Sequence, residues 1–239
     1  MSHSHLQATL RSRLEEAEAR LRAACERSGR RRADVTLVAV TKVVGITIAE
    51  ALPALGVLDL GENRPQELWR KAGALPATVR WHLIGHLQRN KIERTLPLVQ
   101  CIHSVDSLRL LTALEEEAAK RQLAPEVLLE IKASREANKH GFTPEELPAL
   151  APTVGGLRHL RVGGLMTMAA YAKDPEACRL TFVLLRNLRD QLRSELGTPV
   201  ALPHLSMGMS NDFEVAVEEG ATLVRLGSVL FEGLTEAEP

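Results

Sequence analysis

Short apolar runs alternate with helical stretches along most of this chain, and the alternation restricts the folds that it can adopt. Apolar runs that indicate strands occupy residues 35–40, 57–60, 80–84, 101–104, 127–131, 160–165, 202–206 and 222–226. Helices are predicted between them at residues 47–55, 64–73, 88–97, 106–122, 143–152, 174–196 and 211–219. Such alternation is typical of parallel sheets. Eight units in roughly 200 residues favour a closed (β/α)8 barrel, and an open doubly wound sheet is the alternative.

An amphipathic helix is predicted before the first strand, over residues 5–28. Its apolar residues recur every three or four positions: Leu6, Leu10, Leu14, Ala17, Leu21 and Ala24. We therefore expect residues 1–32 to form a helical extension of a single domain that spans 1–239. The pattern does not decide whether this helix packs on its own barrel or on a second subunit, so a monomer and a weak homodimer both remain open.

The charge and the cysteines limit the classes of partner and the compartment. Lys plus Arg and Asp plus Glu each number 30, so the net charge is zero, whereas non-specific nucleic-acid or membrane-surface binding needs a basic excess. No apolar run approaches the roughly 20 residues of a membrane span, and residues 1–32 lack the apolar core of a secretory signal. The cysteines, Cys25, Cys101 and Cys178, lie far apart and predict neither a disulfide framework nor a zinc site. We expect a cytoplasmic protein without nucleic-acid or membrane partners.

Lys42 lies two positions after the first predicted strand, at the end where α/β folds place their functional sites. A lysine that is desolvated there loses its proton more easily, and a neutral amine attacks aldehydes. The alternative is that Lys42 only marks the point where the strand leaves the core.

Glycine and serine residues follow the last two predicted strands. Ser210 is predicted to cap the helix at 211–219, and Gly227-Ser228 follows the strand at 222–226. Free backbone N–H groups and hydroxyls at these two loops are the usual phosphate site of such barrels, although the glycines can also serve tight turns alone. An amine and a phosphate site together suggest pyridoxal 5′-phosphate (PLP) or the sugar-phosphate aldehyde of a class I aldolase.

Histidine and methionine residues near these loops have less specific interpretations. His82 and His86 are separated by a strand end and a glycine, so helical metal-ligand spacing does not apply and no metal site is predicted. Four methionines flank the predicted site, and we expect at least two of them to fill the core: Met166, Met168, Met207 and Met209.

Several of these stretches resemble the pyridoxal phosphate homeostasis protein family. The matching runs follow one another in order over about residues 35–233, and the most specific are residues 81–91 and 205–210. The resemblance implies a TIM barrel like the N-terminal domain of alanine racemase, with PLP held as a Schiff base on Lys42. It also implies a role in intracellular PLP homeostasis, with delivery to apo-enzymes that use PLP.

The resemblance assigns roles to particular residues. Lys42 matches the cofactor lysine, Asn63 a pocket residue, and Arg225 the arginine that faces the pyridine nitrogen. Three further positions match the phosphate site: Ser210, Gly227 and Ser228. Met166, in the matching run 164–167, completes the predicted cofactor-binding set.

The family pattern also has departures in this chain. Val44 stands where many members carry a second lysine, and Asn211 stands where many carry glycine. Lys91 and Lys139 remain as candidate secondary amines.

A carrier is favoured over an enzyme. A guanidinium donates to an unprotonated pyridine nitrogen, and an unprotonated ring is a poorer electron sink. Tyr171 is the only tyrosine and is expected outside the pocket, and we expect no second domain after the last strand, so Lys42 would lack an acid/base partner. The alternative is an amino-acid racemase or decarboxylase of the alanine racemase fold type.

Overall fold

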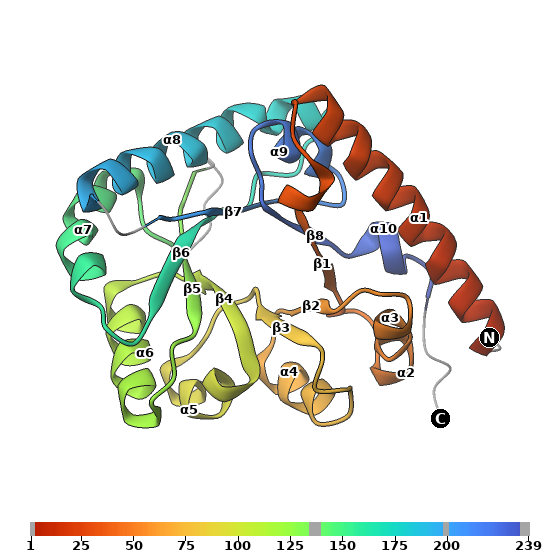
Figure 1. Cartoon of the computed structure of the whole chain (residues 1–239), viewed down its shortest axis with the longest axis horizontal. Helices are drawn as coiled ribbons and strands as arrows, with labels where there is room; N and C mark the ends of the chain where they lie inside the picture. Colours follow the sequence, from red (N-terminus) through yellow and green to blue (C-terminus); the bar gives the residue numbers. More distant parts are fainter. Residues whose placement is uncertain (1–2, 134–139, 198–200, 235–239) are drawn as a thin grey trace.

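Eight parallel strands close into a barrel in which each strand pairs with its neighbours in sequence (Figure 1). The computed structural model describes residues 3–133, 140–197 and 201–234. Strand β1 pairs with β8, with Ala39 opposite Leu226, so the sheet has no open edge. The predicted (β/α)8 barrel is confirmed, and the open sheet is wrong. The strands are β1 Thr36–Val40, β2 Asp59–Glu62, β3 Arg80–Leu83, β4 Val99–Val105, β5 Glu126–Glu130, β6 Arg161–Met166, β7 His204–Met209 and β8 Leu223–Leu226.

Helices and short 3-10 turns connect the strands on the outside of the barrel (Figure 1). The α-helices are α1 His3–Arg27, α2 Ile46–Ala49, α3 Ala51–Ala54, α4 Pro65–Ala72, α5 Ile92–Thr95, α6 Leu108–Arg121, α7 Leu147–Gly156, α8 Arg179–Leu196, α9 Phe213–Glu218 and α10 Ser228–Phe231. The helix predicted at 47–55 is divided into α2 and α3 around Glu50, because Pro53 has no N–H to donate to the preceding turn. Helix α10 was not predicted.

Strand β7 extends beyond its predicted end at residue 206. Its pairing with β8 shifts register between Ser206 and Met209, and Gly208 adopts a left-handed conformation with φ of +92°. A Cβ on Gly208 would lie 2.6 Å from that of Ala216, so only glycine lets the strand pass α9 this closely. The end of β7 and the loop after it contribute Met209, Ser210, Asn211 and Asp212 to a cavity at the carboxyl ends of the strands.

Helix α1 packs on the barrel of its own chain, against α9 and α10 (Figure 1). Its predicted apolar face is buried, and ion pairs flank that face: Arg20 with Glu214 at 2.9 Å and Arg27 with Glu218 at 2.7 Å. Among the described residues, no helix is both long and apolar enough to cross a bilayer.

Candidate functional site

A cavity of about 730 Å³ opens at the carboxyl ends of the strands. Such a volume is typical of small-molecule sites. Six of the seven predicted cofactor-binding residues line it: Lys42, Asn63, Ser210, Arg225, Gly227 and Ser228. They come from β8 and from the loops after β1, β2, β7 and β8, which meet because parallel strands end at one face of a barrel. Their roles in binding stay predictions.

Met166 is the one predicted cofactor-binding residue that does not line the cavity. Its side chain is buried in a small cluster inside the barrel, whereas Met168 and Met209 line the cavity. Met207 is also fully buried, so two of the four methionines fill the core, as expected. Tyr171 lines the cavity with 77% of its surface exposed, and the expectation that it lies outside the pocket is wrong.

Lys42 stands exposed at the rim of the cavity, in the turn that follows β1. The expectation that burial desolvates its amine is therefore wrong. The strand ends at Val40, Thr41 is fully buried, and the turn then directs the next side chain outward.

A buried ion pair holds this turn from beneath. The Lys71 Nζ donates to the carbonyl oxygens of Thr41 and Val44, both at 2.7 Å, and to Oε1 of Glu62. The exposed fractions of the Lys71 and Glu62 side chains are 1% and 0%. The sequence analysis missed this pair. Its only local signal is that Lys71 follows Pro65 and Leu68 at helical spacing on the buried face of α4.

Ser210 contacts the start of α10 rather than capping α9. Its Oγ accepts hydrogen bonds from the backbone N–H groups of Gly227, at 3.1 Å, and Val229, at 3.3 Å. Asp212 occupies the N-cap of α9 instead, and its carboxylate accepts from the Met209 N–H at 2.6 Å. The predicted cap was wrong, but the two predicted loops do contact each other.

Arg225 reaches the cavity from β8 and is 96% buried. Its guanidinium donates to Ser206 Oγ at 2.5 Å and to the Thr167 carbonyl at 2.9 Å. Burial lowers the pKa of Arg225 to about 10, against the opposing effect of the Asp212 and Glu130 carboxylates. The group therefore remains a cation and a hydrogen-bond donor at neutral pH.

The remaining candidates lie in other places. His86 is exposed, pairs with Asp106 at 2.8 Å and stacks on His140, whereas His82 is inside the barrel. Lys91 is not among the cavity-lining residues, and Lys139 lies outside the described residues.

A family model and two similar relatives agree on the family of this chain. The model of the alanine racemase N-terminal domain matches residues 13–234. The pyridoxal phosphate homeostasis protein of Aquifex aeolicus is 42% identical over 220 residues, which cover 92% of this chain and 96% of that protein. That of Deinococcus radiodurans is 40% identical over 88% of this chain and 95% of its own length. The chain belongs to the pyridoxal phosphate homeostasis protein family.

Solved structures agree with the family assignment. A protein described as unknown, from Bifidobacterium adolescentis, has a TM-score of 0.89 at 35% identity and covers 97% of this chain and 98% of its own. PipY of Synechococcus elongatus, solved with PLP bound, has a TM-score of 0.81 at 32% identity, over 93% of this chain and 99% of its own. An alanine racemase of Clostridium difficile, at 16% identity and a TM-score of 0.72, shows the common fold alone.

Proposed function

We propose that this chain binds PLP in the cavity at the carboxyl ends of its strands and takes part in intracellular PLP homeostasis. The observation that carries the proposal is that one cavity collects an amine, a cation and a serine–backbone cluster, from Lys42, Arg225 and Ser210. These match the aldehyde, the ring nitrogen and the phosphate of PLP. The names of the relatives and the PLP bound to PipY support the same ligand.

The loops after β7 and β8 suit a phosphate group. The Ser210 hydroxyl already gathers the N–H groups of Gly227 and Val229, and the Ser228 hydroxyl lies in the same loop. Hydroxyls and backbone N–H groups are common phosphate ligands in barrels of this type. A phosphate would accept from the two serine hydroxyls and would replace Ser210 Oγ as the acceptor for these N–H groups.

Lys42 would supply the amine. Its Nζ would bond to the aldehyde carbon with loss of water, and PLP bound there would supply an electron-withdrawing ring. Because Lys42 is exposed, we infer that its reactivity depends on the approach of the ligand rather than on burial in the free protein.

We favour a carrier over a dedicated enzyme. Arg225 is a donor that cannot transfer its proton to the pyridine nitrogen at neutral pH, which weakens carbanion chemistry. Lys42 stands at an open rim, where a receiving apo-enzyme that uses PLP can approach. The names of the relatives describe homeostasis rather than catalysis.

Borohydride reduction with mass mapping tests the binding proposal. PLP-loaded protein should carry one reduced adduct on Lys42, and Lys42→Ala should carry none there. Lys91→Ala is the matched control and should retain the adduct. An adduct that maps to another lysine while Lys42 stays unmodified would refute the assignment.

The racemase or decarboxylase alternative also needs a test, because the side chain of Tyr171 lines the same cavity and could serve as an acid/base group. An enzyme would exchange the α-proton of amino acids in deuterated water, and the exchange would fall in Tyr171→Phe. Our proposal predicts no sustained exchange in either protein.

A further inference from the structure

A continuous chain of polar side chains crosses the interior of the barrel beneath the cavity. Arg225 Nη1 donates to Ser206 Oγ at 2.5 Å, and that oxygen lies 2.8 Å from His103 Nδ1. His103 Nε2 lies 2.9 Å from His82 Nδ1, and His82 Nε2 lies 3.0 Å from Asp59 Oδ1. These hydrogen-bonded side chains come from β8, β7, β4, β3 and β2, and they run from the cavity to the amino end of β2. All five residues are buried.

The two ends of this chain determine where each proton lies. Arg225 can only donate, and the Asp59 carboxylate can only accept. His82 therefore donates from Nε2 and accepts at Nδ1, so His103 must donate from Nε2. His103 Nδ1 then accepts from the Ser206 hydroxyl, which itself accepts from Arg225. Both histidines are neutral, and each donor has an acceptor.

If the histidines donated in the opposite direction, toward Arg225, the hydrogen-bonding groups would not all find partners. It would make His82 a cation, because both of its ring nitrogens would have to donate. The Ser206 hydroxyl would then receive hydrogen bonds from both His103 and Arg225, and its own hydrogen would have no acceptor among the described residues.

The electrostatic surroundings favour the same protonation states. Burial raises the pKa of Asp59, but hydrogen bonds from Arg80 and His82 overcome this effect and lower it to about 2. Burial, with His82 and Arg225 nearby, lowers the pKa of His103 well below its usual value. The carboxylate is therefore ionised and the imidazole neutral at physiological pH.

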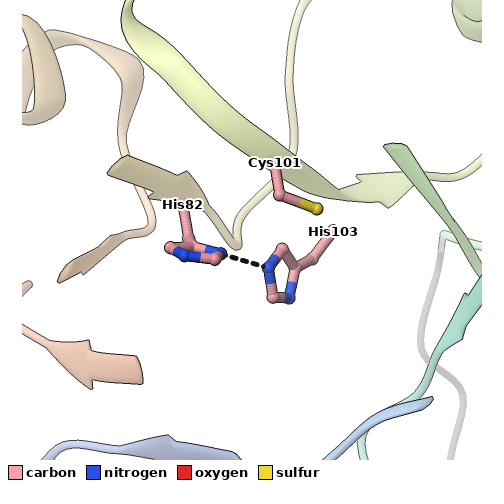
Figure 2. A group of neighbouring side chains, drawn as sticks. All are labelled: His82, Cys101 and His103. Carbon is pink, nitrogen blue, oxygen red and sulfur yellow. Dashed lines mark hydrogen bonds between the residues drawn. The ribbon is translucent and has the colours of Figure 1, made fainter. Parts of the chain in front are cut away.

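Cys101 lies beside the two histidines without joining the chain (Figure 2). One ligand atom from each of His82, Cys101 and His103 lies within 4.8 Å of the others. A shared metal ion would need lone pairs on both facing ring nitrogens, whereas a single proton between them satisfies both. Burial also raises the pKa of the Cys101 thiol, which opposes the thiolate that a metal requires.

We propose that His82 and His103 are neutral positioning residues that fix the Arg225 guanidinium through a one-directional chain of hydrogen bonds to Asp59. The Thr167 carbonyl holds the other terminal nitrogen of Arg225, at 2.9 Å. The consequence for the ligand rests on the proposed function: the guanidinium is presented to the pyridine ring in one orientation. A change several residues away along the chain would then alter the environment of the bound ring.

Nitrogen-15 NMR of the histidine rings tests the chain without any ligand. We expect both rings to be neutral and to carry their proton on Nε2 at neutral pH. Protonation of either ring on Nδ1 would overturn the proposal. Stoichiometric zinc that is lost in Cys101→Ala would also overturn it, in favour of a metal centre.

Substitutions of Ser206 test the positioning role. Ser206→Ala removes the hydroxyl between Arg225 and His103, and we expect a roughly tenfold weaker PLP affinity with a shifted absorption spectrum of the bound ligand. Ser206→Thr keeps the hydroxyl and should restore both properties. Cys101→Ala, which alters packing beside the chain but no hydrogen bond in it, is the control.

The two proposals can fail separately. Correct ring tautomers with unchanged PLP binding in Ser206→Ala would overturn the positioning role and leave the proposed function intact. If the unaltered protein binds no PLP, the proposed function fails, and the Arg225 Nε–H resonance decides the positioning role. We expect solvent exchange to broaden that resonance in Ser206→Ala but not in Cys101→Ala, and equal line widths would overturn the role.

Discussion

Replacement of Lys71 by methionine should destabilise the protein strongly, because it breaks the buried pair beneath the Lys42 turn. The substitution keeps a long apolar side chain but removes the cation that faces Glu62. One oxygen of Glu62, Oε2, is already buried without a hydrogen-bond partner among the described residues, and Oε1 would keep only the Thr41 hydroxyl, at 2.6 Å. The carbonyls of Thr41 and Val44 would each lose the hydrogen bond from Lys71, although the Thr41 carbonyl would keep the Val44 N–H at 3.1 Å.

The size of the effect follows from the burial of both partners. Removal of one member of a buried ion pair costs about 3–5 kcal/mol, because the other charge stays desolvated. In a chain of this length each kcal/mol lowers the melting temperature by about 2–4 °C, so we expect a decrease of roughly 6–20 °C. Removal of both charges in Lys71→Met with Glu62→Leu should recover much of the loss.

Chemical denaturation of these variants measures the free energy of unfolding directly. Arg70→Met is the matched control: Arg70 is the adjacent residue, and its ion pair with Glu67 is half exposed, so the loss should stay below about 1 kcal/mol. If Lys71→Met unfolds within 1 kcal/mol of the unaltered protein, or if the double variant is no more stable than the single one, the reasoning is refuted.

Three further predictions concern the chain of hydrogen bonds inside the barrel, a backbone contact and the N-terminal helix. The pKa of His103 in the folded protein lies below the ordinary 6.5, so its contribution to stability is complete above pH 6.5 and is lost as the pH falls through the folded pKa. The free energy of unfolding should therefore depend less steeply on pH in His103→Gln, and an unchanged slope would contradict the neutral state. Gly85→Ala places a Cβ 2.2 Å from the Asn63 carbonyl oxygen and should cost about 1–3 kcal/mol in thermal unfolding, whereas Gly156→Ala, with nothing within 4 Å, should not destabilise the protein. Leu10→Ala on α1 removes a fully buried side chain and should cost about 2–5 kcal/mol, and Leu180→Ala, 81% exposed, should cost almost nothing; similar losses would contradict the packing of α1 on the barrel.

The features that local patterns encode could be predicted from the sequence. Apolar runs and their spacing gave all eight strands and the buried face of α1, and residues after strands meet at one end of any barrel. That rule placed Lys42 and Ser210 at one cavity, whereas Arg225, within β8, was assigned by the family resemblance.

Features that depend on distant parts of the chain could not be predicted in this way. A serine before a helix is typical of an N-cap, but Ser210 bonds to the start of α10 after the next strand. Lys71 received no predicted role, because its partner Glu62 comes from another element, β2. The predicted barrel places β3 beside β4, but the contact between His82 and His103 depends on the register of the two strands, which no local pattern indicates.

The pairing of β1 with β8 has a consequence for the order in which the cavity can form. Lys42 follows the first strand, whereas Ser210, Gly227 and Ser228 follow the last two, so the rim amine and the serine loops face each other only across this seam. A nascent chain that still lacks β8 has no complete cavity, however well its earlier strands have paired. A ligand that bridges the seam would bind only the closed barrel and would shift the folding equilibrium toward closure.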